Sequence, residues 1–458
     1  MRLLLLLPVC ILPISLRAAE PLPIDPLWKS ETFRKSITAS YGIDSRIEPR
    51  ITKDEAFYLD ASAAAMAKED QATAIKVLTD SSLLATSPAM LFTLAGRQFE
   101  AGQTDESLKN FAAAIEQFPN FRDAHRNYAV ALVQTGKFEE AKPHLIRALE
   151  LGSQDGTTAG LLGYCHAREE HHRPALDAFR LAMLTQPKER QWRIGEAQAL
   201  EALGQSRDAA DLYQSLIEEN PSDSNLWLTQ ADTWIALDSP LKAIVNLELV
   251  HRRGSLSAAA TISLGHLYLQ SDLPALAFDR YRSSLLAAEP PKLDDAVDAV
   301  EMLLNSGEWK SADDIATLIG KTENFRPLLE AEKPDKDLLS RLTRARAIIE
   351  LETGDSAAGA KLVEAWLVRE PLDGPSLLLL ARFREESGLR EEAEMLLEQA
   401  EGISEIASAA HLRHGRLLVG ERDYKKALEH LEKSHELEPH DSLAEYIEAV
   451  RELAPPSR

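Results

Sequence analysis

Cysteine is nearly absent from this sequence, since only Cys10 and Cys165 occur among 458 residues. Cys10 lies in an apolar N-terminal segment that we expect to be removed, so Cys165 would have no partner and no intrachain disulfide could form. A single cysteine in a helical segment is more often a small buried hydrophobic residue than a nucleophile. The fold must therefore be stabilised by packing.

Basic residues are also fewer than acidic residues. The chain has 51 Lys and Arg against 73 Asp and Glu, which gives a formal net charge of −22. Nucleic-acid phosphates and anionic lipid headgroups both attract clustered positive charge. This balance therefore argues against a nucleic-acid-binding protein and against docking on an anionic membrane, and most of the carboxylates are expected on solvated helix faces.

Long hydrophobic runs are missing as well. The run between Arg2 and Arg17 is interrupted by prolines and is too short for a lasting transmembrane helix. One basic residue, a short apolar run and the pair Ala18 and Ala19 instead predict a secretory signal peptide over 1–19, although Arg17 stands where a small side chain is usual. We expect a periplasmic or secreted protein with no membrane span in its mature form. The alternative is a chain anchored in the membrane by an uncleaved N-terminal segment.

Motifs of catalysis are absent too. The sequence contains no Gly-rich phosphate loop, no Gly-x-Ser-x-Gly elbow and no His-Glu-x-x-His pair. The densest group of potential metal ligands is a predicted turn with His166, Glu169, Glu170, His171 and His172. We interpret it as a solvated turn, and tight metal binding there would be needed to support an enzymatic role. His411 and His414 fall on packing positions of a helix, so we predict no catalytic residue, no metal site and no cofactor.

Small residues recur every 34 positions in two columns. The first column contains Ala95, Ala129, Gly163, Ala197, Ala231 and Gly265, and the second contains Ser107, Ala141, Ala175, Ala209, Ala243 and Ala277. A third column contains large residues: Phe111, Leu145, Phe179, Tyr213, Leu247 and Tyr281. If about a quarter of residues are Ala, Gly or Ser, the small columns have a chance probability on the order of 10⁻⁷. The period therefore indicates an internal repeat.

Each repeat is expected to form two short antiparallel helices. Apolar residues three or four positions apart, such as Leu91, Leu94 and Ala95, give the first helix a buried stripe. Glycine or aspartate, as at Gly102 and Asp272, ends that helix. The small columns mark the closest approach of the two helices. Because one pair cannot bury its apolar faces alone, the pairs must stack into a solenoid.

These positions resemble the tetratricopeptide-repeat family. Its pattern is matched by Leu91, Leu94, Ala95, Ser107, Phe111, Ala114 and Pro119, with Gln98 where Tyr is usual. It is matched again by Leu162, Gly163, Ala175, Phe179, Ala182 and Pro187. The resemblance implies an all-α fold, namely a right-handed α-solenoid of stacked helix-turn-helix repeats.

The repeat register divides the chain into six parts. The register slips once, after residue 326, and the stretch before the first repeat is too short for a core of its own. The parts are a signal peptide (1–19), a proline-containing N-terminal arm (20–53), an N-terminal array of about eight repeats (54–326), an insertion or linker (327–339), a C-terminal array of three repeats (340–441), and a capping helix with a tail (442–458).

The resemblance further implies that the first helix of each repeat lines a concave groove. On that basis the partner-binding residues are Arg126, Asn127, Gln134, Tyr164, Arg168, Gln191, Gln198, Asp232 and His266. Together with apolar neighbours they suit a peptide or helix laid along the groove. Family members that bind chaperone tails use a clamp of lysines, asparagines and an arginine. Here only Asn127 fits that clamp, so recognition of a chaperone tail is not predicted.

These observations favour a non-enzymatic, exported scaffold or adaptor that binds a protein or peptide partner in the groove. We expect it to act in a complex of the cell envelope, in assembly or secretion. The alternative is a structural or self-associating spacer without a dedicated ligand groove, and occupation of the groove by residues 20–53 would distinguish the two. The identity of the partner does not follow from the fold, because repeat arrays of one shape bind unrelated ligands.

Overall fold

The computed structural model describes residues 44–329 and 335–454, and within these ranges the regular elements are helices without any strand. This confirms the predicted all-α class. The predicted signal peptide, residues 20–43 of the predicted arm, and 330–334 and 455–458 lie outside the described residues. The chain forms two compact units, whose boundary in the sequence falls between Asn246 and Leu247 in helix α14 (Pro240–Arg252). We call them the N-terminal unit and the C-terminal unit and describe each by itself.

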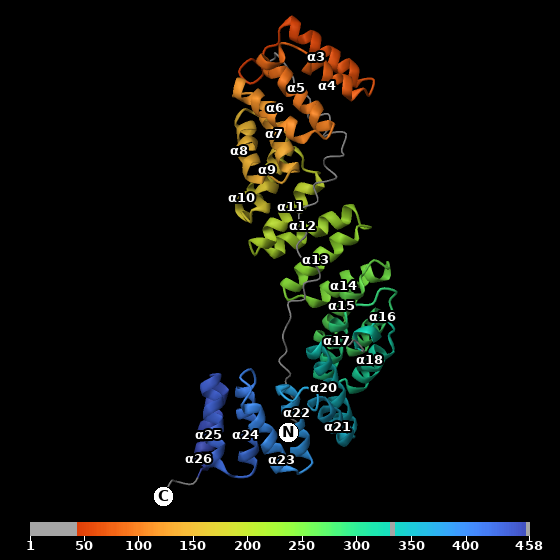
Figure 1. Ribbon diagram of the computed structural model, residues 1–458, viewed down its shortest axis with the longest axis vertical. Helices are drawn as coiled ribbons and strands as arrows, with labels where there is room; N and C mark the ends of the chain where they lie inside the picture. The colour runs from red at the N-terminus through yellow and green to blue at the C-terminus, as the bar shows by residue number, and fades with distance from the viewer. Residues whose placement is uncertain (1–43, 330–334, 455–458) are drawn as a thin grey trace. The chain divides into compact units, whose positions relative to one another are not determined.

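The N-terminal unit consists of helix pairs that follow one another along the chain (Figure 1). Helices α5, α7, α9, α11 and α13 begin at residues 88, 122, 156, 190 and 224, and this constant spacing confirms the predicted repeat period. Its elements before α14 are α3 (Lys53–Met66), α4 (Gln71–Thr79), the 3₁₀ helix η1 (Leu84–Thr86), α5 (Pro88–Glu100), α6 (Thr104–Gln117), α7 (Arg122–Gln134), α8 (Phe138–Glu150), α9 (Gly156–Arg168), α10 (His172–Thr185), α11 (Arg190–Ala202), α12 (Ser206–Glu219) and α13 (Ser224–Ala236).

Packing inside each pair follows the predicted columns. The two small columns touch, because the Ser107 hydroxyl on α6 donates to the Ala95 carbonyl on α5 at 2.7 Å. The first small column also faces the large column, since a methyl group added at Gly163 would lie 2.8 Å from the ring of Phe179. These positions are fully buried, so the recurring residue sizes reflect the closest approach of the paired helices.

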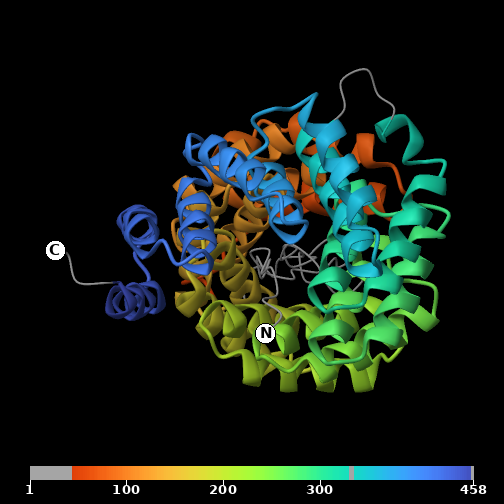
Figure 2. The same ribbon diagram turned by 90° about the horizontal axis from the view of Figure 1, so that it is seen from below.

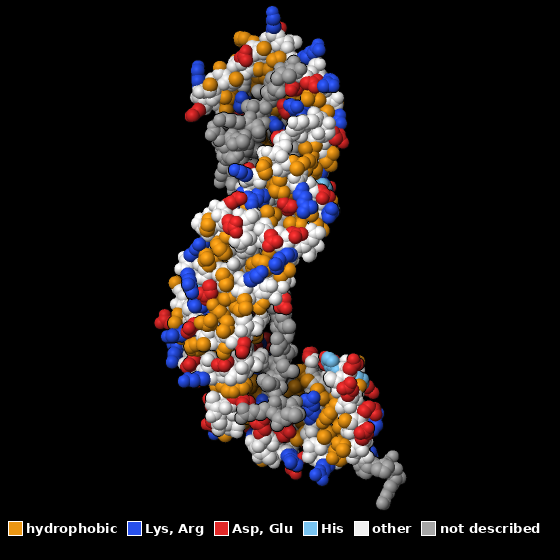
Figure 3. Space-filling model, turned by 180° about the vertical axis from the view of Figure 1, so that it is seen from behind, with side chains coloured by type: hydrophobic (Ala, Val, Ile, Leu, Met, Phe, Trp, Pro, Cys, Tyr) orange, Lys and Arg blue, Asp and Glu red, His pale blue; other side chains and the backbone are white. Residues whose placement is uncertain are grey.

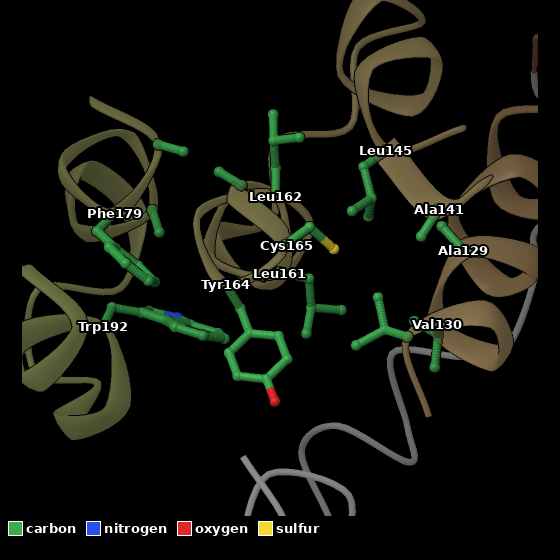
Figure 4. Packing of buried hydrophobic residues seen from close by; sticks show 14 of the residues in the cluster. Ala129, Val130, Ala141, Leu145, Leu161, Leu162, Tyr164, Cys165, Phe179 and Trp192 are labelled. Carbon is green, nitrogen blue, oxygen red and sulfur yellow. The ribbon is translucent and has the colours of Figure 1, made fainter. Parts of the chain in front are cut away.

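The core of the N-terminal unit runs continuously through successive pairs (Figure 4). Trp192 of α11 is fully buried; its ring stacks on Phe179 of α10 with centroids 6.3 Å apart, and its Nε1 donates to Gln186 Oε1 at 2.9 Å. Gly160 of α9 makes room for this indole, because a methyl group there would lie 2.4 Å from it. Cys165 is buried in the same core, and burial raises the pKa of its thiol to about 12, as expected for a small buried residue rather than a nucleophile.

The C-terminal unit continues with helix pairs (Figure 2). Helices α21, α23 and α25 begin at residues 356, 390 and 424, so the same repeat period returns after the predicted slip. The elements after α14 are α15 (Ala258–Gln270), α16 (Pro274–Leu285), α17 (Leu293–Asn305), α18 (Trp309–Lys321), α19 (Arg326–Leu329), α20 (Lys336–Thr353), α21 (Ser356–Leu367), α22 (Gly374–Glu386), α23 (Arg390–Glu401), α24 (Ala407–Gly420), α25 (Tyr424–Leu437) and α26 (Asp441–Leu453).

The helices on either side of the predicted linker pack directly against each other. Helix α20 contacts both α17 and α18, and it begins at Lys336, before position 340 where the register places the C-terminal array. Arg341 of α20 pairs with Asp298 and with Glu301 of α17, the latter at 2.7 Å. The hydrogen bonds that the guanidinium donates to Glu301 and Asp298 raise its pKa above the usual range. The register slip in the sequence therefore does not interrupt the packing of this unit.

Candidate protein-interaction surface

The first helices of successive repeats form one side of the N-terminal unit. Helix α5 contacts α7, α7 contacts α9, and α9 contacts α11, whereas among the described residues no contact of similar extent joins α6 to α8 or α8 to α10. In a curved stack the elements that lie closest together are those on the inner side. These contacts support the placement of α5, α7, α9 and α11 on the concave face, which the family resemblance implies.

Equal helix spacing aligns side chains along this face. Tyr164, Gln198 and Asp232 occupy the same position in three consecutive first helices, one repeat period apart. Gln134 and Arg168 are likewise equivalent at the ends of α7 and α9. The repeat thus arranges chemically different side chains in rows that cross several helices.

The predicted residues on α7 and α9 differ in exposure. Gln134 and Arg168 are exposed, and the Arg168 guanidinium lies 5.7 Å from the ring centroid of Phe138. Asn127 is 3% exposed and accepts a hydrogen bond from Arg126 Nε at 3.2 Å. Tyr164 is also buried. Of these residues, Gln134 and Arg168 are the most accessible to a partner.

Arg126 is tied to the next repeat. Its guanidinium lies 3.7 Å from a carboxylate oxygen of Asp155, the residue that caps α9 by accepting from the Thr158 amide at 2.9 Å. Its side chain is 14% exposed. Arg126 therefore links two repeats in addition to its predicted place on the concave face.

The remaining predicted residues lie in both units. Gln191, Gln198 and Asp232 are half-buried on α11 and α13 of the N-terminal unit, whereas His266 lies on α15 of the C-terminal unit. The His266 ring packs edge-on against Tyr281, with centroids 5.5 Å apart, and burial lowers its pKa to about 4. The contribution of all nine residues to partner binding stays a prediction.

A hollow that sequence reasoning missed lies on the N-terminal unit between α12, α13 and the start of α14. It is open to solvent, has a volume of about 490 Å³ and is lined by Gln214, Gln230, Trp234, Leu241, Lys242, Val245 and Asn246. The Lys242 ammonium stands 4.0 Å above the Trp234 ring, while Leu241 and Val245 are 61% and 63% exposed. The hollow thus combines apolar walls with a cation.

Gln230 forms the floor of this hollow. It is 1% exposed, its Nε2 donates to the Ala210 carbonyl at 3.0 Å, and its Oε1 accepts from Asn246 Nδ2 at 2.9 Å. The equivalent positions of the other repeats hold Leu94, Tyr128, Leu162, Glu196 and Leu264. Because the polar residue Glu196 occupies the same position one repeat earlier, the glutamine gave no distinct sequence signal for the hollow.

Comparisons with known families agree with this geometry. Two tetratricopeptide-repeat models match the chain, one over residues 98–162 and the other over 194–252. Both stretches lie within the regularly spaced succession of paired helices. The chain is a tetratricopeptide-repeat protein.

Curated proteins similar to this tetratricopeptide-repeat protein include DnaJ homolog subfamily C member 3 from mouse, at 22% identity, and from human, at 21%. Each match extends over 316 residues, which is 61% of this chain and 62% of the relative. The chain thus spans less than two thirds of the length of these relatives.

Several solved structures are similar to this tetratricopeptide-repeat protein. A tetratricopeptide repeat protein from Parabacteroides merdae is 17% identical, with 55% of this chain and 98% of that chain covered and a TM-score of 0.37. YrrB, described as a TPR protein with an unusual peptide-binding site, is 16% identical, with 41% and 89% covered and a TM-score of 0.35. MamA from Desulfovibrio magneticus is 17% identical, with 38% and 98% covered and a TM-score of 0.34.

The surface of this tetratricopeptide-repeat protein is chemically mixed. On the face shown in Figure 3, acidic, basic and hydrophobic side chains are interspersed along the described residues. Within the described ranges, no helix has the length and apolar character needed to cross a membrane.

Proposed function

We propose that this protein is an exported scaffold or adaptor that binds a partner peptide or helix along its concave face, in cell-envelope assembly or secretion. A tetratricopeptide-repeat fold implies protein partners. The observation that carries the proposal is the alignment of accessible polar side chains, Gln134 and Arg168, at equivalent positions of α7 and α9. The predicted signal peptide over 1–19 supports export, and with it a partner in the cell envelope.

A ligand running along the concave face would meet repeated features at the spacing of the helices. Each repeat can contact a ligand at two positions, one at the end of its first helix and one in the middle of that helix. Successive residues of a bound peptide, or successive turns of a bound helix, can therefore contact successive repeats. Arg168 contributes a positive charge that an acidic side chain of the partner can pair with. Because that guanidinium is exposed, its pairing should affect association rate and specificity more than affinity.

Site-specific crosslinking tests the proposal. A photo-crosslinking residue would replace Gln134 or Arg168 in a bait containing residues 20–458, which would then be incubated with an envelope extract of the source organism. The matched control position is Arg173 at the start of the second helix α10, where the side chain is 64% exposed. We expect one partner protein to crosslink at positions 134 and 168 and not at 173.

Charge reversal adds a second readout. Arg168→Glu should weaken capture of that partner, and Arg173→Glu should leave it unchanged. Crosslinking of the bait only to a second copy of itself would favour the structural, self-associating spacer. Equal crosslinking at all three positions would contradict a binding site on the concave face.

A further inference from the structure

Four side chains from three consecutive helices of the C-terminal unit converge on one point. Glu401 ends α23, His411 and His414 lie on α24, and His430 lies on α25. Glu401 Oε1 is 3.3 Å from His411 Nδ1, 2.9 Å from His430 Nδ1 and 2.7 Å from His414 Nδ1. The two nitrogens of His411 and His430 are 3.1 Å apart. Three helices thus bring imidazole nitrogens and a carboxylate oxygen together.

Hydrogen bonds among Glu401, His411 and His430 cannot satisfy all three close contacts at once. If both imidazoles carry a proton on Nδ1, both can donate to the carboxylate, but the two nitrogens then face each other as donors. If one Nδ1 is deprotonated, it can accept from the other imidazole, but it then presents a lone pair to the carboxylate. A cation at the centre would instead satisfy all three lone pairs together.

We propose that Glu401, His411 and His430 bind a Zn²⁺ ion. Imidazole nitrogen and carboxylate oxygen are zinc ligands with bond lengths of about 2.0–2.2 Å, and a tetrahedron of that size has edges of roughly 3.4 Å. The observed triangle has sides of 2.9, 3.1 and 3.3 Å, so small movements of the side chains would bring its corners to zinc-binding distance.

Exposure and the neighbouring groups fit such a site. The side chains of Glu401, His411 and His430 are 15%, 17% and 23% exposed, so an ion can enter and water can complete the tetrahedron. His414, whose side chain is 6% exposed, donates to Glu401 and acts as a positioning residue for that carboxylate. Histidine side chains reach the surface over the last helices of the chain (Figure 3). The ion would clamp α23, α24 and α25 together across two repeats.

Two other histidine groups show what distinguishes this one. His125 and His144 in the N-terminal unit also approach each other through their Nδ1 atoms, at 2.9 Å, but no carboxylate within the described part of the chain joins them. His125 Nε2 contacts the Pro119 carbonyl. His166, Glu169 and His171 lie close together, but the Lys142 ammonium pairs with Glu169. The first group offers too few ligands for tight binding, and the second already holds a cation in place of a metal.

Titration of Zn²⁺ into the chelator-treated full-length protein, followed by isothermal titration calorimetry, tests the proposal. Co²⁺ can replace Zn²⁺ in a second titration, because its visible absorption bands report the coordination geometry. We expect one tight site per chain. His430→Ala and Glu401→Gln should each weaken Zn²⁺ affinity by more than about 100-fold, whereas His414→Gln should cost roughly 10–100-fold, the range typical of an outer-shell partner. The tetrahedral Co²⁺ bands should disappear in His430→Ala and persist in His414→Gln.

Matched controls are His144→Ala and His171→Ala, which change the other two histidine groups and should leave affinity and stoichiometry unchanged. Circular dichroism shows whether each variant folds. If His430→Ala does not fold, the Zn²⁺ affinity of the near-isosteric variant Glu401→Gln tests the proposal. The proposal is overturned if the wild-type protein shows no saturable Zn²⁺ binding. It is equally overturned if Glu401→Gln binds like wild type, or if the tight site is lost in His171→Ala.

Discussion

The fit between Gly160 and Trp192 gives the sharpest test of the core. Gly160 lies within α9, and a methyl group added there would stand 2.4 Å from Cδ2 and Cε2 of the indole and 2.6 Å from Cζ2. Carbon atoms normally approach to about 3.5–4.0 Å, so the indole would have to move by roughly 1 Å or more. It has little room to do so, because it is fully buried, stacked on Phe179 and hydrogen-bonded to Gln186.

Two opposing terms determine the effect of Gly160→Ala. Overpacking a well-packed core costs typically about 1–3 kcal/mol. Replacing glycine by alanine within a helix contributes roughly 1 kcal/mol of stabilisation. Because three atoms of a rigid ring lie below 3.0 Å, we place the overpacking cost at the upper end of its range, which leaves a net destabilisation of about 1–2 kcal/mol.

Gly96→Ala is the matched control, since Gly96 lies within the first helix α5 and a methyl group there would have no neighbour within 4 Å. It should stabilise the protein by about 0.5–1 kcal/mol through helix propensity alone. Urea unfolding with unchanged m-values would measure both changes, and hydrogen exchange would localise the effect of Gly160→Ala to α9–α11.

A double substitution completes this test. Leucine is the natural replacement for Trp192, because Leu226 occupies the same position in the next repeat. The double variant Gly160→Ala, Trp192→Leu should show a favourable coupling free energy, because the smaller side chain relieves the overlap. If Gly160→Ala stabilises the protein as much as Gly96→Ala does, or if the double substitution is simply additive, the proposed steric fit is wrong.

Three further predictions concern packing, pH and processing. Ala175→Leu and Ala209→Leu, at fully buried positions of the second small column, should each destabilise by about 1–3 kcal/mol, and unchanged melting of both would contradict the assignment of that column to helix crossings. Burial lowers the pKa of His266 from 6.5 to about 4, so the unfolded chain binds the proton more readily. The stability that this group contributes above pH 6.5 should therefore fall by up to about 3 kcal/mol as the pH drops toward 4. In urea unfolding measured against pH, His266→Phe should lose that contribution and keep the one from His144, whose pKa burial also lowers to about 4. Mass spectrometry of the protein purified from the source organism should find a mature chain that begins at Glu20, and a chain that retains residue 1 would instead support the uncleaved anchor.

The fold class and the pairing of helices could be predicted from the sequence because they depend on residue size at a constant spacing. Ala95 and Ser107 each begin a column of small residues that recurs over six repeats, and a short side chain is required wherever paired backbones approach. The same spacing places Gln134 and Arg168 on the first helices, whose concave orientation came from the family resemblance and is supported by the contacts of α5, α7, α9 and α11. The spacing of small and large residues along the chain was therefore sufficient to predict the helix pairs.

Other features depend on side chains that only packing brings together. Nothing in the sequence pairs Gly160 with Trp192, Gln230 with Asn246, or Arg341 with Asp298, since these partners belong to different helices and do not follow the repeat. Glu401 and His430 likewise become neighbours only when α23, α24 and α25 stack. The sequence by itself determined the repeating architecture, because that follows from short-range periodicity. The tertiary structure alone decided the individual contacts, because their geometry depends on how neighbouring helices cross.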